Sequence, residues 1–260
     1  MSYSDLNYLE LSGVRWEISD TPIMAPKITT TPDNDILSTP RPTAATVIAE
    51  IGRSASSVVP PIAPVATISV ETVRSMATRP NDTSTLNRMI GEFNHPLRPT
   101  ATNTVLPHFG NGKLLIITDT PGPDDDSTGR VLSGAPGDLM DKMLSAIGES
   151  RETTSIVPII FWRTPGGRTP TTSELELARP FIDRAIELIK PRVILTLGTL
   201  PATQICGVNL AKSHGTPVTT ENNGIIIPIF HPNYLILKPT AKRDVWTVLQ
   251  NVQNILKSAE

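Results

Sequence analysis

The sequence predicts an α/β fold, a three-layer sandwich in which a four-stranded parallel sheet lies between two layers of helices. Four short apolar runs recur between residues 114 and 230, and stretches with helical spacing of apolar residues separate them. The runs are apolar at consecutive positions, which indicates strands that are buried on both faces. Alternation of such strands with helices is typical of a parallel sheet that is covered on both sides.

The strands are expected where the apolar runs lie, because turn residues bound each run. In chain order these runs are residues 114–117, 155–162, 192–197 and 225–230. The expected helices are residues 82–93, 137–147, 171–190, 201–207 and 240–257. Asp82 precedes the first helix as an N-cap, and Thr171 with Glu174 has the spacing of a capping box for the third. Pro191 ends that third helix.

The first 80 residues differ in composition from the rest of the chain. Pro, Thr, Ser and Ala dominate residues 21–72, and the chain as a whole contains 25 prolines. Such a segment buries too little apolar area to offset its chain entropy. We therefore predict that residues 1–80 form a low-complexity, mostly disordered segment, in which residues 4–12 could form a short helix, and that residues 81–260 form the folded domain. A Pro-rich docking peptide is the alternative for the first segment.

Charge and cysteine content exclude several classes of protein. The formal net charge is −2, which argues against a polycationic nucleic-acid coat protein but leaves room for an enzyme that contacts DNA through a local patch. Cys206 is the single cysteine, so we expect no disulfide within the chain and no cysteine-held zinc or iron–sulfur site. No apolar stretch approaches the roughly 18 residues of a membrane span, and the acidic N-terminus lacks the basic start of a secretory signal. We expect a cytoplasmic protein.

The first strand leads directly into a candidate catalytic carboxylate. Asp119 follows the run 114–117, Pro121 and Gly122 then force a turn, and three more carboxylates follow at 124–126. Open α/β sheets bind ligands at the carboxyl ends of their strands, which is where Asp119 would lie. The alternative is an acidic surface loop, and we interpret residues 124–126 mainly as turn and cap residues.

The last strand leads into a second unusual loop, residues 230–239. His231 can hydrogen-bond to a group that develops negative charge, although a lone histidine often only caps local backbone. The apolar residues 234–237 precede three cations, Lys238, Lys242 and Arg243. An apolar wedge beside cations suits insertion between DNA bases while phosphates are bound. The alternative is that these apolar residues begin the last helix and pack inward.

The second strand is followed by a Gly-bearing loop with an arginine on each side. Arg163 and Arg168 flank residues 164–167, and such a loop can contact phosphates, although both arginines could equally be solvated charges. Right-handed crossovers place every strand-to-helix loop at one edge of a parallel sheet. The unusual loops therefore converge on one rim, and this convergence indicates a functional site.

Five motifs of the folded region resemble, in order and spacing, those of the uracil-DNA glycosylase superfamily, nearest its family 4 branch. They are TDTPG at 118–122 with the acidic residues after it, RTPGGRTP at 163–170, RPF at 179–181, PRVILTLG at 191–198 and HPNYLI at 231–236. The resemblance covers residues 82–256 and leaves the Pro-rich segment outside.

This resemblance implies an enzyme that flips deoxyuridine out of DNA and hydrolyses its N-glycosidic bond. It gives Asp119 the role of orienting water or stabilising the cationic sugar, and His231 the role of stabilising the departing uracil anion. It places the substrate near Thr118, Thr120, Pro121, Gly122, Leu132 and Pro158. The candidate DNA contacts are Arg163, Arg168, Leu235, Ile236, Lys238, Lys242 and Arg243, with Leu235 and Ile236 as the wedge. The implied partner is DNA that contains uracil or another damaged base, bound by a monomer.

The chain also departs from the family 4 pattern. Asp119 replaces a glutamate, Leu132 stands at the aromatic that stacks on uracil, and Pro158 stands at the asparagine that reads its edge. Trp162 and Ala178 occupy positions of the second pair of iron–sulfur cysteines, and His95 lies near one of the first pair. We therefore expect no cofactor and no metal.

Two functions remain open at this point. The first is an active base-excision glycosylase with weakened or altered base choice, and the second is a non-catalytic member of the fold that binds DNA or a protein through the same rim. A nucleotide-binding protein is a weaker third reading, because the chain contains neither of the two common Gly-rich phosphate-binding motifs.

Overall fold

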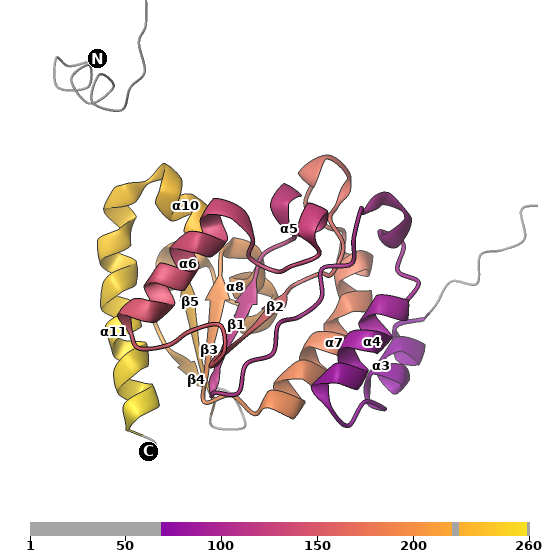
Figure 1. Cartoon of the computed structure of the whole chain (residues 1–260), viewed down its shortest axis with the longest axis horizontal. Helices are drawn as coiled ribbons and strands as arrows, with labels where there is room; N and C mark the ends of the chain where they lie inside the picture. The colour runs from indigo at the N-terminus through magenta and orange to yellow at the C-terminus, as the bar shows by residue number, and fades with distance from the viewer. Residues whose placement is uncertain (1–68, 220–223, 259–260) are drawn as a thin grey trace, which may run out of the picture. The chain divides into compact units, whose positions relative to one another are not determined.

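The computed structural model describes residues 69–219 and 224–258 (Figure 1). The short helix predicted over residues 4–12 lies outside the described residues. A five-stranded sheet forms the centre of the folded region, in the order β2-β1-β3-β5-β4. Its strands are β1 (Leu114–Thr118), β2 (Thr154–Pro158), β3 (Val193–Leu197), β4 (Val218–Thr219) and β5 (Ile225–Ile229).

Four of the five strands are parallel, and they are the four that the apolar runs predict. The addition is β4, two residues that pair antiparallel with β5 at the edge of the sheet. The predicted α/β fold with a parallel four-stranded core is thus confirmed, with a short antiparallel strand added. Two residues of mixed character give too little periodicity to be read as a strand.

Helices cover both faces of the sheet (Figure 1). One face packs against α3 (Val70–Ala77), α4 (Thr83–Glu92) and α7 (Thr172–Ile189), and the other against α6 (Gly134–Ala146) and α11 (Lys242–Lys257). The remaining α-helices are α5 (Pro123–Thr128), α8 (Thr199–Cys206), α9 (Leu210–Ser213) and α10 (Pro232–Leu237). Three short 3-10 helices complete the set: η1 (Arg98–Thr100), η2 (Pro165–Gly167) and η3 (Pro239–Ala241).

The sheet divides the core into two apolar clusters. Along β1, Leu115 and Ile117 pack with the α3–α4–α7 layer, whereas Leu114 and Ile116 pack with the α6–α11 layer. This alternation follows from the strand geometry, in which successive side chains point to opposite faces. Every residue of β1 is buried, which explains why the strand is apolar at consecutive positions.

Three elements differ from the sequence predictions. Helix α3 lies in the segment that we expected to lack structure; Ser69 caps it, and Val73 and Ala77 pack toward α7. Strand β2 ends at Pro158 rather than at Trp162, because residues 159–162 are buried without being paired as a strand, and apolarity alone does not distinguish the two states. Residues 232–237, expected as a loop, form α10.

Helix α10 begins where its sequence permits. His231 is its N-cap and Pro232 its first residue, a position where the missing N–H of proline costs nothing.

None of the helices in the described residues combines the length and the apolar character that crossing a membrane requires.

Candidate active site

The carboxyl ends of β1, β3 and β5 bring Asp119 and His231 together. Asp119 follows β1, Gly198 follows β3, and His231 lies two residues beyond the end of β5. The Gly198 N–H donates to the Ile229 carbonyl at 2.9 Å, which ties two of the strand ends together. A Cβ atom on Gly198 would lie 3.1 Å from Asp119 Oδ2 and 3.5 Å from His231 Cβ. The two predicted catalytic side chains therefore flank one glycine.

Gly198 is a site residue that the sequence analysis did not identify. Its backbone has φ +97° and ψ 177°, a region that essentially only glycine adopts. The backbone conformation disfavours a side chain at this position, and an added Cβ would also require the Asp119 carboxylate to shift. The signal available in the sequence was a glycine placed directly after an apolar strand.

Asp119 is a half-buried carboxylate. Its Oδ1 accepts a hydrogen bond from the Thr120 N–H at 2.8 Å. Burial raises the pKa of Asp119 above its usual value, and the Thr120 N–H partly opposes that rise. A carboxylate with a raised pKa is a stronger base than an exposed aspartate, which suits contact with water or with a positive charge.

His231 is held as a neutral ring with its hydrogen on Nε2. Its Nδ1 accepts from the Asn233 N–H at 3.1 Å, so in the neutral ring the hydrogen lies on Nε2. Nε2 lies 3.2 Å from Thr118 Oγ1, to which it donates. Burial lowers the pKa of His231 to about 4, so the imidazole is neutral at pH 7. The arrangement places a neutral hydrogen-bond donor beside the Asp119 carboxylate.

The six predicted substrate-binding residues occupy two environments. Thr118 is the last residue of β1 and pairs in register with Pro158 at the end of β2, and Thr120, Pro121 and Gly122 lie in the turn after β1. Leu132 lies in the apolar core on the α6 side, 3% exposed and with φ +51°. Neither Pro158 nor Leu132 offers a polar side-chain atom to a bound base.

Arg168 has an ionic partner within the protein. Its guanidinium contacts the Glu174 carboxylate through two hydrogen bonds, at 2.6 and 2.9 Å. This pair lowers the pKa of Glu174 to about 2. The Glu174 side chain also accepts from the Thr171 N–H in the predicted capping box. Arg168 thus braces the start of α7, whereas Arg163 is half-buried in the same loop.

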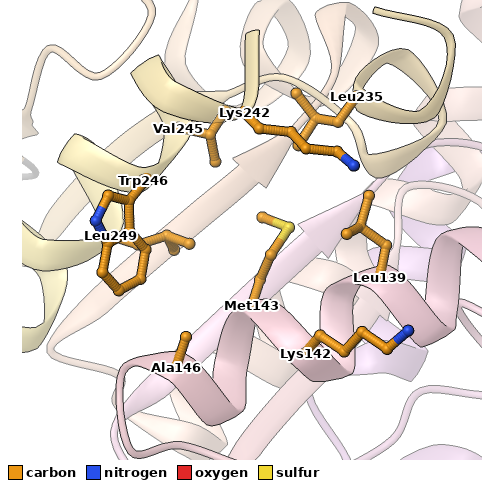
Figure 2. Close-up of a pocket in the computed structure, with 9 residues that line it drawn as sticks. All are labelled: Leu139, Lys142, Met143, Ala146, Leu235, Lys242, Val245, Trp246 and Leu249. Carbon is orange, nitrogen blue, oxygen red and sulfur yellow. The ribbon is translucent and has the colours of Figure 1, made fainter. Parts of the chain in front are cut away.

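The two predicted wedge residues are on different sides of α10. Leu235 is 1% exposed and packs in the core, because α10 turns this side chain inward. Figure 2 shows Leu235 and Lys242 lining an apolar groove between α6, α10 and α11. The volume of the groove is about 230 Å³. Ile236 is 42% exposed and Leu237 is 84% exposed. An inserted wedge must be exposed, so Ile236 and Leu237 are the surface candidates.

Basic side chains lie beside this exposed apolar tip. Lys238, Lys242 and Arg243 are all exposed at the junction of α10 and α11. Lys238 Nζ lies 5.9 Å from the centre of the Tyr234 ring. Unlike Arg168, none of the three cations forms a salt bridge with the residues described in the structure, so their charges remain available to a ligand.

Comparison with known proteins identifies the family. Residues 107–252, more than half of the 260-residue chain, match the uracil DNA glycosylase superfamily. The chain belongs to the uracil-DNA glycosylase superfamily. A type-4 uracil-DNA glycosylase of Thermotoga maritima is 33% identical over 148 residues, which cover 54% of this chain and 76% of that protein. The type-4 enzyme of Archaeoglobus fulgidus is 31% identical over 159 residues, covering 57% and 79%.

The iron–sulfur cluster that the family 4 branch implies does not fit this member of the superfamily. Such clusters are held by cysteine thiolates, and the chain has one cysteine, half-buried at the end of α8. Trp162 and Ala178, at the expected cysteine positions, are both 0% exposed and tightly packed. Among the described residues, no group of three or more His, Cys, Asp or Glu side chains is placed to hold a metal ion.

An aromatic cluster fills this part of the glycosylase fold. The His95 and Trp162 rings stack, with centroids 4.5 Å apart and an interplanar angle of 7°. Phe93, Phe161 and Phe181 pack around them with centroid separations between 5.1 and 6.2 Å. Three of the five phenylalanines and one of the three tryptophans of this aromatic-poor chain are thus concentrated at one place.

Hydrogen bonds anchor the cluster to three segments of the chain. His95 Nδ1 accepts from the Leu97 N–H at 3.1 Å, so Nε2 carries the hydrogen and donates to the Glu174 carbonyl at 3.0 Å. Trp162 Nε1 donates to Thr104 Oγ1 at 3.0 Å. The loop after α4, the loop after β2 and the start of α7 are therefore tied together by side chains.

The strain and close approach at Gly198 predict a costly Gly198→Ala change. We expect a loss of about 3 kcal/mol in the free energy of unfolding, because alanine must adopt the glycine-only backbone and displace the Asp119 carboxylate. Gly207→Ala is the matched control, since Gly207 also has a positive φ, +68°, but no atom lies within 4 Å of its added Cβ. That control should lose about 1 kcal/mol. Equal losses in urea unfolding would contradict the role of the close approach.

The aromatic cluster predicts two graded effects at His95. His95→Ala removes the stacked ring and both hydrogen bonds, and we expect a loss of about 2–4 kcal/mol in the free energy of unfolding. His95→Phe keeps a ring against Trp162 and should lose about 1–2 kcal/mol. Urea unfolding of both variants measures the difference. A loss below about 1 kcal/mol for His95→Ala, or unfolding of the wild type by an iron chelator, would overturn this interpretation.

Proposed function

We propose that this protein is a DNA base-excision glycosylase, which hydrolyses the N-glycosidic bond of uracil or a related deaminated base flipped out of DNA. The observation that carries the proposal is that the Asp119 carboxylate and the neutral His231 ring both lie against Gly198, at the ends of neighbouring strands. Membership of the superfamily and the names of the type-4 relatives support the choice of reaction.

The two side chains suit the two charges that develop when the glycosidic bond breaks. The sugar becomes cationic, and the Asp119 carboxylate can stabilise that charge and orient the water that adds to the sugar carbon. The base leaves as an anion, and the His231 N–H can donate a hydrogen bond to it. A histidine with a pKa of about 4 stays neutral throughout, so it acts as a donor and not as a source of the proton.

The surface at α10 suits the flipping of a base. Ile236 and Leu237 form an exposed apolar tip beside Lys238, Lys242 and Arg243. Apolar side chains that enter a base step unstack it, while cations bind the flanking phosphates. We therefore assign the wedge to Ile236 and Leu237, and the phosphate contacts to these cations together with Arg163.

A second function is favoured by one observation, the lack of polar side-chain atoms at Pro158 and Leu132. A pocket that cannot read the base edge through these positions would suit a catalytically impaired member of the fold, acting as a DNA- or protein-binding module. The two functions share the DNA-facing surface and differ in whether a base is released.

The catalytic proposal predicts the loss of base excision in two variants. We expect Asp119→Asn to lower the single-turnover rate by about 10²–10⁴-fold, and His231→Ala by about 10²–10³-fold. The melting temperature of Asp119→Asn should remain nearly unchanged, because Asp119 lies beyond the end of the sheet rather than in its core. His231→Ala also removes the N-cap of α10, so its melting temperature should fall by a few degrees while the protein stays folded. The assay uses a labelled oligonucleotide with one uracil, followed by alkali to cleave abasic sites.

Asp124→Asn is the matched control for this experiment, because Asp124 is an exposed carboxylate five residues further along the chain. It should cleave at the wild-type rate. Cleavage by Asp119→Asn at that rate would refute the assignment of Asp119. Absence of cleavage by the wild type on uracil, hypoxanthine and xanthine would favour the binding module instead.

The DNA-facing surface predicts a change in salt dependence. Lys238→Ala combined with Arg243→Ala should weaken DNA binding and reduce the slope of log K against log salt by about 2, one unit for each lost phosphate contact. Fluorescence anisotropy at several salt concentrations measures this slope. Arg74→Ala with Arg88→Ala is the control, since it makes the same charge change at side chains that are 66% and 67% exposed on α3 and α4. An equal effect in the control would contradict a local DNA surface.

A further inference from the structure

The hydroxyl of Thr118 lies within hydrogen-bond distance of His231 Nε2. Thr118 Oγ1 is 3.2 Å from this nitrogen, and 113 positions of the sequence separate Thr118, at the end of β1, from His231, the N-cap of α10. We propose that Thr118 is a positioning residue: in the free protein its hydroxyl accepts the His231 Nε2–H, and this bond holds the ring at the rotation from which the hydrogen bond passes to a departing base. This inference rests on the proposed function, in which His231 donates a hydrogen bond to the departing base, and it adds Thr118 as the residue that orients the ring.

The position of the Thr118 hydroxyl is fixed by the sheet. Thr118 is the last residue of β1, is 4% exposed, and pairs in register with Pro158 on β2. Its carbonyl also accepts from the Ile159 N–H at 2.9 Å. A β-branched side chain on a buried strand has few rotamers, so the hydroxyl is an immobile acceptor.

Two hydrogen bonds from different elements then fix the imidazole. The Asn233 N–H, in the first turn of α10, binds Nδ1 and selects the neutral form with hydrogen on Nε2. Thr118, on β1, accepts that hydrogen and sets the rotation of the ring. A donor that is already oriented needs little reorganisation when negative charge develops on a leaving base. Thr118 thus acts on the reaction through His231.

The neighbouring strand has no group that could replace the hydroxyl. Pro158, the partner of Thr118 in register, has neither a side-chain donor nor an acceptor. Asp119 Oδ1 is engaged by the Thr120 N–H, and among the described residues no hydrogen bond joins Asp119 Oδ2 to the His231 ring. Loss of the Thr118 hydroxyl therefore leaves the half-buried Nε2–H without this partner, and the ring is then held by the Asn233 N–H alone.

Thr118→Val and Thr118→Ser separate the hydroxyl from the shape of the side chain. Valine has the shape of threonine and fits a buried strand, so this variant should fold, but its side chain cannot accept a hydrogen bond. We expect kcat to fall about tenfold with KM nearly unchanged, whereas serine should restore the rate to within about threefold of the wild type. Thr196→Val is the control, because Thr196 is a fully buried threonine of β3 whose hydroxyl lies 3.7 Å from Cys206 Sγ.

A second measurement does not depend on activity. NMR of protein labelled with ¹⁵N-histidine follows the His231 Nε2–H, which should exchange slowly with water in the wild type, Thr118→Ser and Thr196→Val, and fast in Thr118→Val. The same exchange rate and kcat in Thr118→Val as in the wild type would overturn the inference. If the wild type cleaves no oligonucleotide, the proposed function fails, and the exchange rates alone decide whether Thr118 holds the ring.

Discussion

The close approach of three strand ends is the constraint on which the site depends. Parallel strands β1, β3 and β5 are neighbours in the sheet, so the residues that follow them emerge side by side. Asp119 and His231 can share one site only because Gly198 between them has no side chain. The order of the strands brings Asp119 and His231 close together, and Gly198 adds no side chain between them. The chemistry follows from burial, which raises the pKa of Asp119 and lowers that of His231.

A second requirement is that the loops around the site stay in place without a metal cluster. In this chain the stacked rings of His95 and Trp162 and the hydrogen bond from His95 to the Glu174 carbonyl join the loops. The Glu174 side chain in turn holds Arg168. One glutamate therefore links the aromatic cluster to the loop after β2. Arg168, a predicted DNA contact, forms an ion pair with Glu174 within the protein in this structure.

The fold could be predicted because its signals are local and strong. Apolar runs located the four parallel strands, and the capping box at Thr171 located the start of α7. The missed elements carry weak or ambiguous signals: α3 lies in a segment of misleading composition, and α10 is too short for its periodicity to show. The burial of the Leu235 side chain could not be predicted, because the direction of this side chain depends on whether residues 232–237 form a loop or a helix. The role of Gly198 could not be predicted, because it depends on how closely Asp119 and His231 approach this glycine, and these residues are far apart in the sequence.

The residues proposed for catalysis are positioned by the backbone, whereas recognition of a base depends on the side chains around it. The proposed catalytic pair, Asp119 and His231, is positioned by the backbone, through strand ends and an N-cap, so this arrangement persists wherever the sheet and α10 form. Recognition of a base depends on side chains, and Pro158 contributes none that can donate or accept. The one hydroxyl at the end of β1, that of Thr118, is already engaged by His231. Under the proposed function, discrimination between bases would rest on the Thr120 hydroxyl, on the backbone groups of the turn after β1 or on shape, and each of these discriminates less sharply than a bidentate side chain. A glycosylase built in this way would retain its chemistry and broaden its choice of base.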